Sequence, residues 1–146
     1  MNTQEALELI EAVHSGEYED AGLEVKRAQR GLPQHLFETL SAFANQAGGG
    51  VILLGLDESQ GFRLAGVEAA QTVISELTDL VGKMVPPLAL EITPIEIEGK
   101  TVIVVDAPEC NYQHKPCHYG PSGMQGGSFL RVGNQNRHMS AYERYI

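Results

Sequence analysis

Residues 23–58 decide the fold of this chain, and they read LEVKRAQRGLPQHLFETLSAFANQAGGGVILLGLDE. The first four residues alternate apolar and charged side chains, as a half-buried strand does. A segment with apolar residues at helical spacing opens at Leu32-Pro33 and ends at Phe43-Ala44-Asn45. The glycines 48–50 end this helix, and residues 51–56 are almost entirely apolar, which is typical of a strand covered on both faces. The stretch therefore predicts a strand, a helix and a buried strand.

Hydrophobic periodicity predicts further helices and strands on both sides of this stretch. Helices are expected over 3–13, over 69–81 and from Ser140 onward, and strands over 62–67, 88–97, 101–105 and 129–132. The segment 108–127 is rich in glycine, proline and histidine and predicts a long loop. This order of elements predicts an α+β domain with a mixed β-sheet packed with helices.

Composition and charge narrow the class of protein. With 146 residues the chain has the length of one domain, and it holds no run of about 18 apolar residues that would span a membrane. The two cysteines do not form a disulfide framework, so we expect reduced thiols and a cytoplasmic protein. The net charge of -9 argues against nonspecific nucleic-acid binding by the chain as a whole. The charge is uneven, however, because residues 1–25 carry no Lys or Arg and residues 110–146 carry four.

An ordered set of short motifs resembles the Schlafen AlbA-like domain. The set comprises E-x-K at 24–26, S-A-F-A-N at 41–45, the glycines 48–50, G-x-D at 55–57, G-V at 66–67, Gly99-Lys100 and R-V-G at 131–133. The resemblance covers residues 16–146, which we expect to be the Schlafen AlbA-like domain, and residues 1–15 are expected to be an N-terminal helix.

This resemblance implies a role for the chain. In bacteria and archaea the family forms the N-terminal domain of transcriptional regulators that bind DNA, and it is also described as a divergent ATP-binding class. It precedes a C-terminal winged-helix region, so we expect this chain to be part of a longer regulator. Related domains pair to form a binding groove, which implies a homodimer.

Animal Schlafens cut RNA through three acidic residues, which correspond here to Glu19, Glu24 and Asp57. Carboxylates that converge in this way would bind Mg²⁺ or Mn²⁺ and activate water, and Lys26 would stabilise the developing negative charge. These four residues are the candidate catalytic set, and the three acids are the candidate metal ligands. In the alternative interpretation, Glu24 and Lys26 form a surface ion pair and Asp57 starts a turn.

Arginine, lysine and asparagine side chains suit contacts to phosphates and base edges. The candidate nucleic-acid contacts lie after the first strand and in the C-terminal third: Lys26, Arg27, Arg30, Lys115, Tyr119, Arg131, Asn134 and Arg137. In the alternative interpretation these are scattered solvated charges.

Two other sites have weaker patterns. Gly99-Lys100-Thr101 resembles the end of a phosphate-binding loop, but the first glycine of that pattern is replaced by Pro94 and the tripeptide lies in a hairpin turn. Cys110, His114, Cys117 and His118 have the right atoms for zinc, but alternation along a strand would point neighbours 117 and 118 to opposite faces. A polar loop with one buried cysteine is the alternative there.

The function predicted from the sequence is nucleic-acid binding by a transcriptional regulator. A metal-dependent nuclease is the first alternative. A sensor or oligomerisation module that does not touch nucleic acid is the second, and the acidic first helix favours it.

Overall fold

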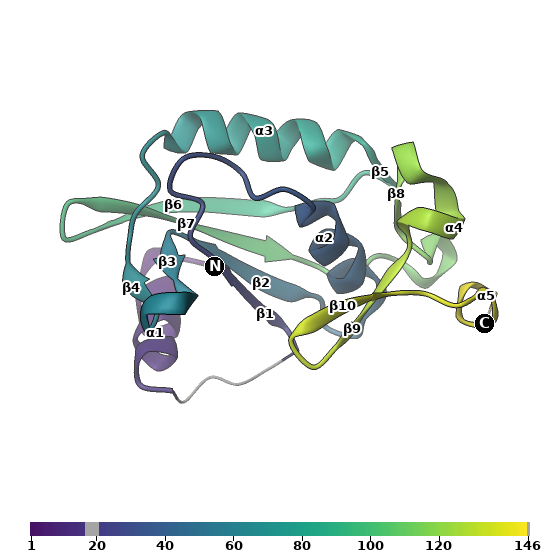
Figure 1. The fold of residues 1–146 in the computed structure, drawn as a ribbon, viewed down its shortest axis with the longest axis horizontal. Helices are drawn as coiled ribbons and strands as arrows, with labels where there is room; N and C mark the ends of the chain where they lie inside the picture. The colour runs from purple at the N-terminus through teal and green to yellow at the C-terminus, as the bar shows by residue number, and fades with distance from the viewer. Residues whose placement is uncertain (17–20, 146) are drawn as a thin grey trace.

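The structure, a computed structural model, describes residues 1–16 and 21–145 (Figure 1). Its helices are α1 (Thr3–His14), α2 (Leu36–Asn45), α3 (Ala70–Gly82), α4 (Gly123–Gly127) and α5 (Ala141–Arg144). Its strands are β1 (Leu23–Lys26), β2 (Gly50–Leu54), β3 (Leu56–Asp57), β4 (Arg63–Leu64), β5 (Met84–Val85), β6 (Glu91–Ile97), β7 (Lys100–Ala107), β8 (His118–Tyr119), β9 (Phe129–Val132) and β10 (Gln135–His138). Short 3-10 helices cover Glu58–Gln60, Tyr112–His114 and Gly120–Ser122.

A mixed sheet with the strand order β1-β2-β7-β6 forms the centre of the domain. β1 and β2 are parallel, with Leu23 opposite Val51, because the helix α2 carries the chain back between them. β2 pairs antiparallel with β7, and β7 pairs antiparallel with β6 through the tight turn at Glu98-Gly99. β1 therefore lies at one edge of this sheet.

Helices cover both faces of the sheet (Figure 1). Side chains alternate along β2, so that Ile52 and Leu54 pack in one cluster with α2 and α3, and Leu53 packs in the other cluster with α1. Burial on both faces is the physical reason why β2 and β7 are nearly continuous apolar runs. A capping box between Asn2 and Glu5 starts α1, which brings its apolar stripe onto the sheet.

The smaller strands form hairpins and pairs around this core. β3 pairs with β4, β5 with β8, and β9 with β10, each antiparallel. The β9–β10 hairpin lies beside α2 and near the free edge of β1 (Figure 1). A second capping box, between Ser140 and Glu143, starts α5 directly after β10.

The predicted α+β fold with a mixed sheet is confirmed. Several local details differ from the prediction: the strand predicted over 62–67 is only Arg63–Leu64, and the short strand β5 was not predicted. α2 begins at Leu36 rather than near Pro33, because His35 adopts a left-handed conformation with φ of 65°. The segment 108–127 is not one open loop but contains short helices and β8, and the polar strand β10 was not predicted. Within residues 1–16 and 21–145, no helix is both long and apolar enough to cross a bilayer.

Candidate functional site

A cleft of about 610 Å³ opens along the free edge of β1. Its walls come from β1, from the segment after β3 and from the β9–β10 hairpin, and they include Glu24, Lys26, Phe62, Arg131 and Asn134. Four candidate residues predicted from the sequence therefore meet here, although they come from both ends of the chain. The parallel pairing of β1 and the turn of the β9–β10 hairpin bring them together.

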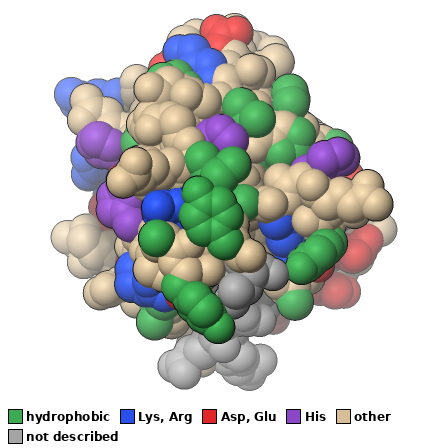
Figure 2. Space-filling model, turned by 90° about the vertical axis from the view of Figure 1, so that its right-hand side faces the viewer, with side chains coloured by type: hydrophobic (Ala, Val, Ile, Leu, Met, Phe, Trp, Pro, Cys, Tyr) green, Lys and Arg blue, Asp and Glu red, His purple; other side chains and the backbone are tan. Residues whose placement is uncertain are grey.

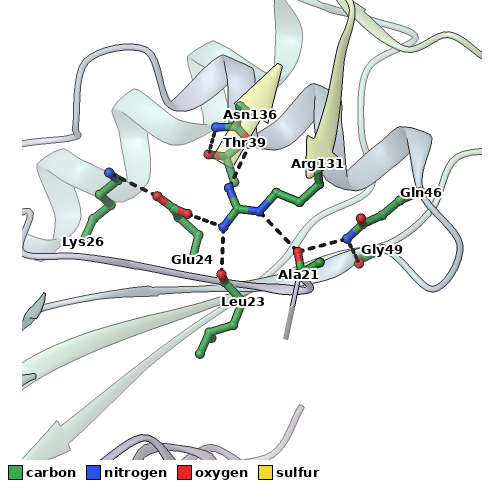
Figure 3. Close-up of polar contacts among 9 residues, drawn as sticks. All are labelled: Ala21, Leu23, Glu24, Lys26, Thr39, Gln46, Gly49, Arg131 and Asn136. Atoms are coloured by element: carbon green, nitrogen blue, oxygen red, sulfur yellow. Dashed lines mark hydrogen bonds and ion pairs between the residues drawn. The ribbon is translucent and has the colours of Figure 1, made fainter. Parts of the chain in front are cut away.

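Arg131 is the centre of the polar contacts in this cleft (Figure 3). Its side chain is only 1% exposed. The guanidinium donates hydrogen bonds to the carbonyl oxygens of Ala21 (3.2 Å) and Leu23 (2.9 Å) and to the Oδ1 of Asn136 (2.9 Å). It also contacts the Glu24 carboxylate at 2.5 Å, and its Cζ lies 5.2 Å from the centre of the Phe43 ring. Arg131 thus satisfies carbonyl groups at the edge of the sheet that β1 would otherwise leave without a strand partner.

Arg131 is one of the predicted nucleic-acid contacts, and the structure shows its guanidinium in contact with the protein itself. Its side chain is 1% exposed, and it donates hydrogen bonds to backbone carbonyls. Asn136 extends the same network, because its amide nitrogen donates to the Thr39 hydroxyl on α2 (3.0 Å). Arg131 and Asn136 therefore join the hairpin to β1 and α2.

Glu24 faces two cations. Its Oε2 faces Arg131, and its Oε1 lies 3.1 Å from the Nζ of Lys26 (Figure 3). Glu24 and Lys26 are two residues apart on one strand, so their side chains share a face. The Glu24 side chain is 11% exposed and that of Lys26 is 44% exposed. The ion pair of the alternative interpretation is therefore present, and Lys26 is the member that reaches solvent.

Asp57 is buried at the end of β3, where it caps the 3-10 helix Glu58–Gln60. Its Oδ1 accepts hydrogen bonds from the Ser59 hydroxyl (2.7 Å) and the Ser59 amide (3.1 Å). Its Oδ2 lies 3.8 Å from both the Arg27 and the Arg63 guanidinium groups. The Ser59 hydroxyl lowers the pKa of the Asp57 carboxyl most, and the Ser59 amide and the two guanidinium groups lower it further against the opposing effect of burial.

These contacts decide how well a divalent cation fits the predicted acids. Each of Glu24 and Asp57 faces two positively charged side chains, which a metal ion would have to displace. Among residues 1–16 and 21–145, no group of three or more His, Cys, Asp or Glu side chains could hold a metal ion. The third predicted ligand, Glu19, lies outside the described residues. Glu24 and Asp57, the two described members of the predicted set, are therefore both engaged in ion pairs with cationic side chains.

The other predicted contacts lie at separate places. Lys115 pairs with Glu109, and Arg137 pairs with Glu143, both near α5. Tyr119 stacks on Phe37 with ring centres 4.2 Å apart, so its ring is part of the packing beside α2. By contrast, Arg27, which is 60% exposed, and Arg30 are accessible beyond the end of β1.

Among the residues that the structure describes, the four candidate zinc ligands do not form a group that could hold a metal ion. Cys117 is fully buried, and burial raises the pKa of its thiol to about 12, so it is protonated at neutral pH. Cys110 is partly buried, and burial also raises the pKa of its thiol. Both cysteines behave as packing residues.

The glycines predicted to end α2 have a packing role. Gly49 has φ of +65°, and a Cβ atom at this position would lie 2.2 Å from the carbonyl oxygen of Ala107. A glycine at 49 thus lets the chain pass close to the end of β7 as it turns from α2 into β2. Lys100 in the β6–β7 turn donates to the Leu64 carbonyl (3.2 Å). Neither feature forms a phosphate cradle at a helix N-terminus.

Comparison with models of known protein families identifies the family of this chain. The family model described as Schlafen, AlbA_2 matches residues 19–140. The chain belongs to the Schlafen AlbA_2 family.

Some solved structures are similar in fold to this AlbA_2 domain. One is the N-terminal domain of a Nitrosomonas europaea protein named as related to the ATP-dependent DNA helicase RecG; it has 29% identity and a TM-score of 0.69, and the match covers 96% of this chain and 95% of that one. Another is the DIP2311 protein of Corynebacterium diphtheriae, with 17% identity and a TM-score of 0.63; the match covers 93% of this chain but 26% of that one. No curated protein matches the sequence.

The S-A-F-A-N motif of this AlbA_2 domain has a structural explanation. The Ser41 hydroxyl donates to the Cys117 carbonyl (2.7 Å) and accepts from the Phe129 amide (2.9 Å). Asn45 accepts from the Cys117 amide (2.7 Å) and donates to the carbonyls of Cys117 and Phe129 (3.0 and 3.1 Å). One face of α2 therefore holds the β8 and β9 segments in place, and with them the hairpin that carries Arg131.

Sequence reasoning missed Arg63, a further exposed cation near the cleft of this AlbA_2 domain. Arg63 is 56% exposed and shares Asp57 with Arg27. It sits on β4 opposite Asp57, so the hairpin register pairs the two charges. The signal was an opposite-charge pair across a short hairpin, which can be recognised only once the register is known.

Proposed function

We propose that this AlbA_2 domain binds nucleic acid through the cleft beside β1 and the cations at its end. The observation that carries the proposal is the grouping of Lys26 and Asn134 in one cleft, next to the exposed guanidinium groups of Arg27 and Arg63. Such side chains suit phosphate oxygens and base edges. The acids Glu24 and Asp57 pair with these cations, and the exposed acid Glu58 also lines the cleft. Together with the buried Arg131, the cations exceed these acids by one charge, although the whole chain carries -9.

A solved structure of the same fold also supports nucleic-acid binding. The Nitrosomonas domain of the same fold belongs to a protein named as related to a DNA helicase, and its match spans nearly all of both chains. We further propose that the domain is part of a longer, cytoplasmic transcriptional regulator. This regulator would act as a homodimer and carry a C-terminal winged-helix region.

A salt titration tests the proposal. Fluorescence anisotropy would follow binding of labelled single-stranded and duplex oligonucleotides between low and moderate salt. The double variant Lys26→Ala/Arg27→Ala should bind more weakly and should lose about 0.7–0.9 from the log–log salt slope for each phosphate contact removed. The matched control is Lys83→Ala/Lys100→Ala, which removes the same charge from exposed positions outside the cleft walls. Equal affinities for the two double variants would refute the cleft as the binding surface.

The metal-dependent nuclease is the alternative outcome of the same experiment. It requires Glu24 and Asp57 to exchange their ion pairs for a metal, with Glu19 as a third ligand. Incubation of the oligonucleotides and of tRNA with Mn²⁺ or with a chelator would distinguish the two. Cleavage that depends on Mn²⁺ and disappears in Glu24→Gln would favour the nuclease over the binding domain.

A further inference from the structure

A second pocket, of about 390 Å³, lies at the other end of the β9–β10 hairpin, beside α5. Tyr112, Lys115, Pro116, Met139, Arg144 and Tyr145 contribute to its lining. A volume near this size suits one small aromatic ligand.

Aromatic rings are unusually exposed around this pocket. Tyr112 is 75% exposed and Tyr145 is 81% exposed, whereas Pro116 of the same lining is buried. Figure 2 shows this side of the molecule, where hydrophobic side chains lie among Lys, Arg and His, and acidic side chains lie mainly at the rim. Exposed tyrosine rings beside cations are the combination that stacks bases of single-stranded nucleic acid.

The charges at the pocket favour an anionic ligand. The Arg144 guanidinium donates to the Met139 carbonyl (2.9 Å), which holds it at the rim. Lys115 also lines the pocket, and its ammonium is paired with Glu109. The acidic residue of the lining, Glu143, is already paired with Arg137 by two hydrogen bonds of 2.8 and 3.0 Å. Its carboxylate also accepts from the Ser140 amide (2.8 Å), so its negative charge is engaged within the protein.

The strand β10 connects a residue of the cleft to a residue of the pocket along the chain. Asn134, in the β9–β10 turn, lines the cleft, and Met139, directly after β10, lines the pocket. Five residue steps in a strand span roughly 16 Å. Arg137 lies on β10 with a side chain that is 49% exposed. A single strand whose phosphates contact the cleft could therefore bring a base further along the same strand to the pocket.

We propose that the pocket beside α5 is a subsite for one unstacked nucleobase, which stacks on Tyr112 and Tyr145, so that the domain prefers single strands or unpaired segments to duplex. This inference rests on the proposed function, because the cleft supplies the phosphate contacts. A base inside a duplex is already stacked and cannot enter such a pocket.

The test uses an oligonucleotide that carries 2-aminopurine, whose fluorescence changes when the base stacks. In Tyr112→Ala/Tyr145→Ala, single-strand affinity should fall by roughly 5- to 150-fold, since base stacking on aromatic side chains is worth that much. Duplex affinity should stay unchanged. The matched control is Tyr142→Ala, because Tyr142 is 75% exposed on α5 but does not line the pocket. Tyr145→Phe should retain the fluorescence change.

Two results would overturn the inference, and they are distinguishable. If the double tyrosine variant binds single strands as Tyr142→Ala does, with salt dependence intact, the subsite is refuted and the proposed function stands. If the unmodified chain binds neither single strand nor duplex at low salt, the proposed function fails and the subsite fails with it.

Discussion

The buried guanidinium of Arg131 should contribute far more to stability than the exposed ammonium of Lys26, although both neutralise Glu24. Replacing Arg131 by Met keeps the volume of the stem but removes the charge and the hydrogen-bond donors. The carbonyls of Ala21 and Leu23 then lose a partner, and the 11% exposed Glu24 keeps only Lys26. Breaking a buried ion pair costs about 3–5 kcal/mol, and the lower value applies here because one cation remains.

Lys26→Ala removes a cation from the same carboxylate at a position that is 44% exposed. Exposed ion pairs contribute about 0.2–1 kcal/mol, so the two variants should differ several-fold in destabilisation. Urea unfolding followed by far-UV circular dichroism measures both free energies by linear extrapolation.

A double-mutant cycle with Glu24→Gln isolates the Arg131–Glu24 pair and should give a coupling of about 0.5–3 kcal/mol. Arg131→Lys keeps the charge and provides a milder variant if Arg131→Met does not fold. A destabilisation of Arg131→Met no larger than that of Lys26→Ala would refute the reasoning that Arg131 holds the hairpin to the sheet.

Three further predictions concern the scaffold of the site. Gly49→Ala should destabilise the domain by more than Gly48→Ala in thermal unfolding, because both have positive φ but only the Cβ at 49 would clash with backbone. Asn45→Ala should lower the free energy of unfolding by about 1–3 kcal/mol, since buried backbone groups lose their partner; an unchanged urea midpoint would contradict this. The guanidinium of Arg137 most of all, together with the Ser140 amide and hydroxyl, lowers the pKa of the Glu143 carboxyl to about 2. Its stabilising effect should therefore be complete above the ordinary pKa of 4.5 and be lost as the pH falls toward 2, and a carboxyl ¹³C titration should show the midpoint rise toward 4.5 in Arg137→Ala.

The sequence predicts the sheet and its helices because their signals are local. The apolar run in β2 and the alternation in β6 follow directly from burial on one or two faces. β10 was missed because its residues, 135–138, are all polar and its pairing depends on β9. The candidate nucleic-acid contacts were harder to predict, because an arginine in a strand is ordinarily exposed. The burial of Arg131 depends on carbonyl groups more than 100 residues away in the sequence, which no local pattern records.

The most direct measurement of nucleic-acid binding at the β1 cleft is a ¹H–¹⁵N correlation spectrum recorded during titration with a single-stranded oligonucleotide. Binding at the cleft should shift the amides of 23–27, 58–63 and 133–134 first, because these segments form its walls and its cationic end. Shifts confined to α1 or α3, or no shifts at all at low salt, would contradict the proposal.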